Sequence, residues 1–92
     1  NPETMNNIGV AYSSLEMFGA ATTWLKKALE KDPDYALVNF NLASSLVEMG
    51  QLDEAMKYAE KAAQLDPATH LEAIEELRRK IKIKREEAEE EL

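Results

Sequence analysis

The chain has 92 residues, of which 18 are Asp or Glu and 11 are Lys or Arg, so its formal net charge is −7. This length supports one small domain and excludes a two-domain enzyme. The chain has no Cys, which excludes a disulfide framework and a thiolate metal site. The acidic balance argues against nucleic acid or an anionic membrane as the main partner, and no apolar stretch approaches the ~20 residues of a membrane span.

No charged-then-apolar leader follows Asn1, so we expect a piece of a longer protein or a designed chain. The absence of Cys and of a signal peptide favours a cytoplasmic location, although the compartment itself is left open.

Apolar residues recur at helical spacing, and we expect helices near residues 2–15, 18–31, 35–49, 52–65 and 69–91. Gly50 suits the left-handed position just past a helix end. Pro33 and Pro67 end the second and fourth helices, because proline cannot continue the hydrogen-bonded turns. Thr69 and Glu72 have the spacing of a capping box, which predicts that Thr69 starts the fifth helix.

Residues 2–35 align with residues 36–69 at a separation of 34 residues. Six pairs are identical at this separation: Asn7 and Asn41, Ala21 and Ala55, Lys27 and Lys61, Ala28 and Ala62, Asp32 and Asp66, and Pro33 and Pro67. Small residues such as Gly9 and Ala43 recur where two helix axes must approach to ~8–10 Å. The sequence therefore predicts an all-α fold with one helical hairpin at 2–35 and a second at 36–69.

This pattern resembles the tetratricopeptide repeat (TPR) family, whose unit is a 34-residue helix–turn–helix. The family's W-x-x-L-G-x-x-Y stretch is matched by Met5-x-x-Ile8-Gly9-x-x-Tyr12, and more loosely by Asn39-x-x-Leu42-Ala43-x-x-Leu46. The family's later Ala, aromatic, Ala and Pro fall on Ala21, Leu25, Ala28 and Pro33, and then on Ala55, Ala59, Ala62 and Pro67. The resemblance implies a right-handed α-solenoid of about five helices, formed by a single domain over residues 1–92.

Residues 69–92 are expected to form a long capping helix. Their apolar positions align with the second hairpin only at a separation of 35, where Leu77 corresponds to Leu42. Arg78 then replaces the small Ala43, so no further helix can pack closely there. Oppositely charged residues four apart are expected to pair along this helix: Glu75 with Arg79, Glu76 with Lys80, Lys82 with Glu86, and Arg85 with Glu89. The tail from Lys82 is expected to project beyond the repeats.

No residue set typical of catalysis is present. The three Gly are scattered, so no phosphate-binding loop is expected, and the single His70 is interpreted as a solvated turn residue. We therefore expect no enzyme activity, no metal and no cofactor.

The inner face formed by the first helix of each hairpin is the predicted binding surface. By the resemblance, Asn7 and Asn41 match the family's groove asparagine, whose amide can donate to and accept from a bound backbone. The alternative is that the two asparagines only tie adjacent helices together. The candidate peptide-binding residues are Asn6, Asn7, Val10, Leu37, Phe40, Asn41, Ser44 and Val47.

The apolar candidates Leu37, Phe40 and Val47 exceed what the core pattern requires, so an exposed contact cluster is expected. Alternatively, the C-terminal helix covers part of it. One branch of the family binds the terminal carboxylate of a peptide with basic residues, some of which lie on the first helix of the third repeat. Those positions carry Glu72 and Glu76 here, so we reject that ligand.

Two function classes remain open. The first is a protein-interaction scaffold that binds a peptide or a partner helix. The second is a self-assembling module, natural or designed, that forms homo-oligomers, with a two-fold homodimer as its commonest closed form. For the second class we expect Met5, Phe18 and Leu25 to be exposed at the N-terminal end. The apolar stripe Ile74, Leu77, Ile81, Ala88 and Leu92 would then pack on the inner face of another copy.

Overall fold

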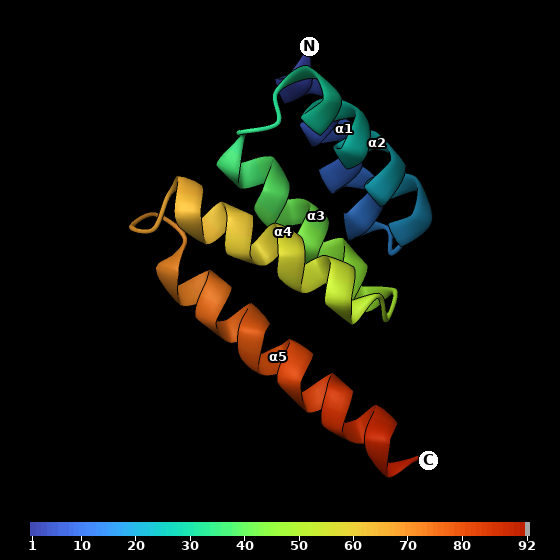
Figure 1. The fold of residues 1–92 in the computed structure, drawn as a ribbon. Coiled ribbons are helices and arrows are strands. Elements are labelled where there is room, and N and C mark those ends of the chain that lie inside the picture. Colours follow the sequence, from blue (N-terminus) through green and yellow to red (C-terminus); the bar gives the residue numbers. More distant parts are fainter. Residues whose placement is uncertain (92) are drawn as a thin grey trace.

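The computed structural model describes residues 1–91, which form five α-helices and no β-strand. The helices are α1 (Pro2–Ser14), α2 (Phe18–Lys31), α3 (Ala36–Glu48), α4 (Leu52–Leu65) and α5 (Leu71–Glu90). Successive helices run antiparallel, α1 with α2 and α3 with α4 forming two hairpins (Figure 1). Helix α2 packs on α3, and α5 packs on α4 and α3. The all-α prediction is therefore confirmed.

The two outermost helices of the stack, α1 and α5, have different N-terminal caps. At α1, the side chain of Asn1 accepts a hydrogen bond from the N–H of Thr4 (3.0 Å), and Pro2 occupies the first turn. Helix α5 begins at Leu71, two residues later than predicted, and no side chain caps it. The prediction of a capping box at Thr69 is wrong, because the N–H of Thr69 bonds instead to Oδ1 of Asp66 (3.2 Å) and stays in the turn.

Helices α1 and α3 end in the same backbone motif. The N–H of Met17 donates to the carbonyl of Tyr12 (2.9 Å), and the N–H of Gln51 donates to the carbonyl of Leu46 (3.0 Å). The residue in between must then adopt a left-handed conformation. Gly50 does so with φ of 77°, as predicted. Glu16, which lies 34 residues earlier, does so with φ of 60°.

Close packing of the hairpins depends on the small residues. A Cβ added to Gly9 would lie 2.8 Å from the side chain of Leu25 and 3.2 Å from the carbonyl of Ala21. Leu25 is itself fully buried, so the expectation of its exposure is wrong. It reaches into the core shared with α3, where it joins Val38 and Leu42. Met5 and Phe18, which were also expected to be exposed at this end, are half-buried.

Asn39 occupies the position of the repeat motif's first large residue. Its side chain is fully buried, and its amide Nδ2 donates to the carbonyls of Pro33 (3.2 Å) and Tyr35 (2.9 Å). The departure from an aromatic residue thus replaces an apolar contact with two hydrogen bonds that fix the connection between α2 and α3.

Helix α5 docks through Ile74, Leu77 and Ile81, which are buried. Leu77 and Ile81 belong to the same core cluster as Leu42 and Leu46, which fits the separation of 35 residues.

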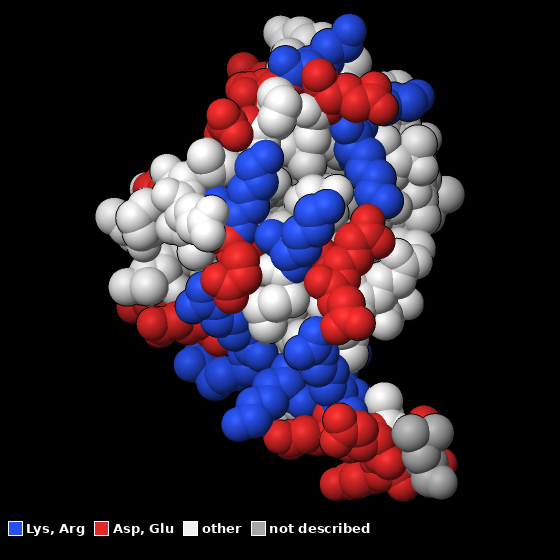
Figure 2. All heavy atoms as spheres, viewed as in Figure 1, with Lys and Arg blue, Asp and Glu red and all other residues white. Residues whose placement is uncertain are grey.

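The ion pairs of α5 differ from those predicted. Within the described residues, all of them join α5 to other helices: Arg78 to Glu60 (3.0 and 2.8 Å), Lys80 to Glu48, and Arg85 to Asp53. Figure 2 shows a band of basic residues where the last helix leaves the body, followed by an acidic end. Because Lys84 and Arg85 are half-buried, the exposed projection begins at Glu86 rather than at Lys82. Leu92 lies outside the described residues.

Candidate functional site

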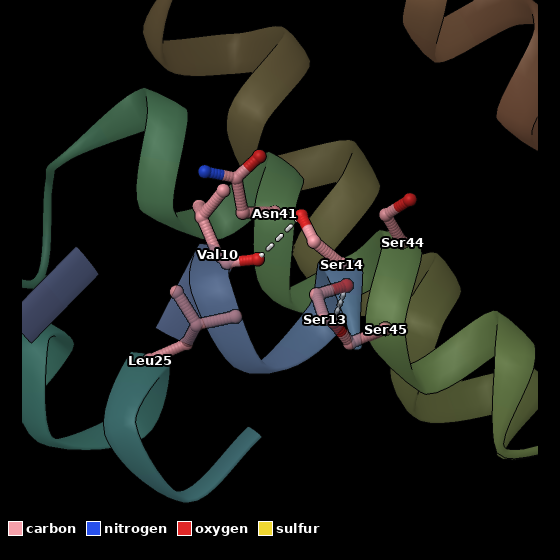
Figure 3. Close-up of a pocket in the computed structure, with 7 residues that line it drawn as sticks. All are labelled: Val10, Ser13, Ser14, Leu25, Asn41, Ser44 and Ser45. Carbon is pink, nitrogen blue, oxygen red and sulfur yellow. Dashed lines mark hydrogen bonds between the residues drawn. The ribbon is translucent and has the colours of Figure 1, made fainter. Parts of the chain in front are cut away.

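A cavity of ≈ 180 Å³ opens between α1 and α3 (Figure 3). Its wall carries four hydroxyl groups, one amide and two aliphatic side chains, and it has no charged residue. The lining residues are Val10, Ser13, Ser14, Leu25, Asn41, Ser44 and Ser45. Each comes from a helix end or helix face that the hairpin packing holds in place, so the cavity is preformed.

Hydrogen bonds between α1 and α3 order the polar wall. Nδ2 of Asn41 donates to Oδ1 of Asn6 (3.0 Å), and the hydroxyls of Ser13 and Ser45 lie 3.4 Å apart. Asn6 is buried, so the prediction that it contacts a peptide directly is wrong, and its Oδ1 instead holds the amide of Asn41. Asn41 keeps its amide oxygen and a second N–H for other partners, and its amide lies at the rim of the cavity (Figure 3). Asn41 therefore ties α3 to α1 through one hydrogen bond, as the alternative prediction stated, and its remaining amide atoms are left for other partners.

The remaining candidates divide by exposure. Asn7 is exposed, as are Val10 (40%) and Leu37 (38%), and Ser44 is half-buried at the cavity wall. All four are at least partly accessible, and their contact with a ligand stays a prediction.

Phe40 is half-buried because its ring stacks on His70, with centroids 5.6 Å apart and planes 8° apart. The interpretation of His70 as a solvated turn residue is wrong. His70 is half-buried, since the turn before α5 lies against Phe40 and covers part of the predicted apolar cluster.

Val47 is not part of the open face. It is 1% exposed and belongs to the buried cluster with Ala43, Leu77 and Ile81. Its repeat equivalent, Ser13, faces α3 across the contact between the two first helices. Val47 faces α5 in the same way, and this equivalence is the sequence pattern that would have placed it correctly.

Helix α5 extends the inner face with charged residues. A contact between neighbouring first helices recurs here. Ser45 on α3 contacts Ser13 on α1, and its α5 counterpart at a separation of 35, Lys80, contacts Glu48 on α3, the residue next to the Ser13 counterpart Val47. The hydrogen bond from Lys80 is the main cause that holds the pKa of the Glu48 carboxyl below its ordinary value, and the nearby charges of Lys80 and Lys84 act in the same direction.

The cavity positions of α3 recur on α5 with different chemistry. At the same separation of 35, Asn41, Ser44 and Ser45 correspond to Glu76, Arg79 and Lys80. These three line a shallow hollow of ≈ 460 Å³ together with Ile83, Lys84 and Glu87. The predicted binding residues did not include these positions, because the inner face was predicted from the two hairpins alone and α5 was treated only as a cap.

Residues 1–91 contain no group of three or more His, Asp or Glu side chains placed to hold a metal ion. None of the helices in this range is both long enough and apolar enough to cross a membrane.

Stacked antiparallel hairpins with an accessible inner face define a helical-repeat protein. The sequence model of the tetratricopeptide repeat matches residues 15–81, which is more than half of the chain. The chain therefore belongs to the tetratricopeptide repeat family, whose members generally mediate protein–protein interactions and are not enzymes. A comparison with curated proteins finds no match.

Proposed function

We propose that the protein binds a peptide or a partner helix on the inner face formed by α1, α3 and α5. The observation that carries this proposal is the cavity between α1 and α3, where a hydroxyl- and amide-lined wall meets the exposed side chain of Val10. A bound main chain has alternating N–H and C=O groups, which Ser44 and the free amide atoms of Asn41 can satisfy.

The apolar contribution comes from Leu37 and Phe40 on α3, beside the cavity. Leu37 is partly exposed, and the Phe40 ring has one face against His70. An apolar side chain of the ligand seated on these two residues would supply the anchor that usually dominates such interfaces.

Alanine substitutions test this site. Peptides are first selected from a random display library on the 92-residue chain, and their affinities are measured by fluorescence anisotropy. Phe40→Ala and Asn7→Ala should each weaken binding by about 1–3 kcal/mol, through lost apolar contact and unpaired backbone groups. Asn7 is the cleaner polar variant, because Asn41→Ala would also leave Oδ1 of the buried Asn6 without its donor.

The matched control is Gln64→Ala, which removes an exposed amide from the opposite, α2–α4 side of the molecule. It should leave the affinity unchanged. Peptides that ignore Phe40→Ala and Asn7→Ala would place the binding site elsewhere on the protein.

Self-association is the second candidate, and one observation favours it. Ile8 and Tyr12 are half-buried, whereas their repeat equivalents Leu42 and Leu46 are almost completely buried. The equivalent face of α3 is covered by α2, and no helix within residues 1–91 covers this face of α1. A second copy packed there should give a dimer mass in light scattering that Ile8→Lys reduces. A monomer at high micromolar concentration would rule out this alternative and leave the peptide-binding proposal.

A further inference from the structure

We infer that the ligand of the inner face carries a basic side chain beside its apolar anchor, because α5 lines this face with unpaired carboxylates. This inference rests on the proposed function and specifies the chemistry of the partner.

The position of α5 follows from repeated contacts. The 35-residue separation of α3 and α5 relates Ser45 to Lys80, which both contact the preceding first helix, and it also relates Leu37, Phe40 and Asn41 to Glu72, Glu75 and Glu76. These three glutamates therefore occupy on α5 the inner-face positions that the binding residues occupy on α3. All three are exposed, and none forms an ion pair within residues 1–91.

The start of α5, which carries the glutamates, lies beside the apolar anchor site. His70, which stacks on Phe40, is the residue immediately before α5, so the first two turns of α5 start beside that ring. Glu3 adds a fourth exposed carboxylate at the same end of the face, since it is the repeat equivalent of Leu37. An apolar side chain seated on Leu37 and Phe40 thus has carboxylates on both sides.

The basic residues of α5 do not neutralise this end. Arg78, Lys80 and Arg85 are engaged with acidic residues of α3 and α4. Arg79 and Lys84 line the hollow together with Glu76, so Glu76 marks the point where the acidic start of α5 meets its basic stretch, and Glu72 and Glu75 lie outside that hollow. The inner face is therefore acidic where its helices begin and basic further along α5, so a ligand with one basic end has a preferred direction. In a peptide, the chemical complement of such carboxylates is a Lys or Arg side chain, which can form charge-assisted hydrogen bonds with them.

The charge of selected peptides tests this inference. A random-peptide display library is selected on the 92-residue chain and, in parallel, on a variant with Glu72→Lys, Glu75→Lys and Glu76→Lys. The wild-type protein should enrich peptides of positive net charge, with Lys or Arg within a few residues of an apolar residue. The variant should enrich peptides of negative net charge.

Affinity measurements then separate local from overall attraction. The triple variant Glu72→Gln, Glu75→Gln, Glu76→Gln should weaken the wild-type peptides by at least about fivefold, and added salt should reduce the difference. The control triple variant Glu89→Gln, Glu90→Gln, Glu91→Gln changes the net charge equally on the exposed end of the same helix. It should change the affinity by less than about twofold, because these residues lie beyond the inner face.

The outcomes distinguish this inference from the proposed function. Enriched peptides that are neutral or acidic, yet still depend on Phe40, would overturn the charge inference and leave the binding site in place. Equal losses in the two triple variants would also overturn it, since they would reflect net charge alone. If no peptide is enriched, or if the enriched peptides ignore Phe40→Ala and Asn7→Ala, the proposed function itself fails.

Discussion

Glu16→Gly is expected to stabilise the protein, although it removes a charged side chain and creates no contact. Glu16 and Gly50 occupy the same position in two equivalent helix endings, with φ of 60° and 77°. The side chain of Glu16 is exposed and forms no ion pair within the described residues. The substitution therefore acts through the backbone alone.

The magnitude follows from two opposing terms. A left-handed conformation costs a residue with a Cβ roughly 1–2 kcal/mol, which glycine avoids. Glycine in turn has more conformational freedom to lose on folding, which costs roughly 0.5–1 kcal/mol. The net gain is about 0.5–1 kcal/mol, and in a chain of this length it should raise the melting temperature by roughly 2–8 °C.

Thermal and urea unfolding, followed by circular dichroism at 222 nm, measure this gain. Glu16→Ala is the matched control, because it removes the same charge but keeps the Cβ, and it should leave stability nearly unchanged. Gly50→Ala introduces the same strain in the second hairpin and should cost about 1 kcal/mol or more. The reasoning is wrong if Glu16→Gly raises the free energy of unfolding no more than Glu16→Ala does, while the dependence of that free energy on urea concentration stays the same.

Two further perturbations probe the packing and the ion pairs. Gly9→Ala should destabilise the protein by about 1–3 kcal/mol, because the new Cβ meets Leu25 at 2.8 Å; Gly19→Ala, with no atom within 4 Å of the new Cβ, should not. The pKa of Glu48 is lowered in the folded state, mainly by its hydrogen bond to Lys80. The contribution of the Glu48 carboxylate to the free energy of unfolding is therefore complete above its unfolded pKa of about 4.3. It is lost as the pH falls through the lower pKa of the folded state. Urea midpoints should consequently fall less steeply between about pH 5 and pH 3 in Glu48→Gln than in the wild type, and equal slopes would contradict this assignment.

The helices and hairpins were predictable because they depend on local spacing. Identical residues 34 apart, together with Pro33 and Pro67, placed the ends of α2 and α4 correctly. The start of α5 was misplaced because Asp66 competes for the N–H of Thr69. A capping pattern alone cannot show which of two acceptors that N–H will take.

The site was less predictable because it depends on contacts between helices. Residues four apart on α5 satisfied the rule for ion pairs, yet Lys80 and Arg85 reach acidic partners on the neighbouring hairpin. Val47 had the composition of an exposed contact residue, and only the placement of α5 shows that it is buried. The contribution of α5 to the inner face became visible once the 35-residue displacement was matched by an actual contact.

The attachment of α5 has a consequence for local opening. Three buried side chains and three partly exposed ion pairs hold this helix, and it contributes only Leu77 and Ile81 to the core cluster, whose other buried members come from α2, α3 and α4. Such ion pairs contribute little and are screened by salt, so α5 should detach at a lower free energy than is needed to unfold the two hairpins. Its amides should then exchange with deuterium fastest, and faster still in high salt. A ligand that touches both α3 and α5 must slow that exchange, because occupancy of the inner face and docking of α5 become one linked equilibrium.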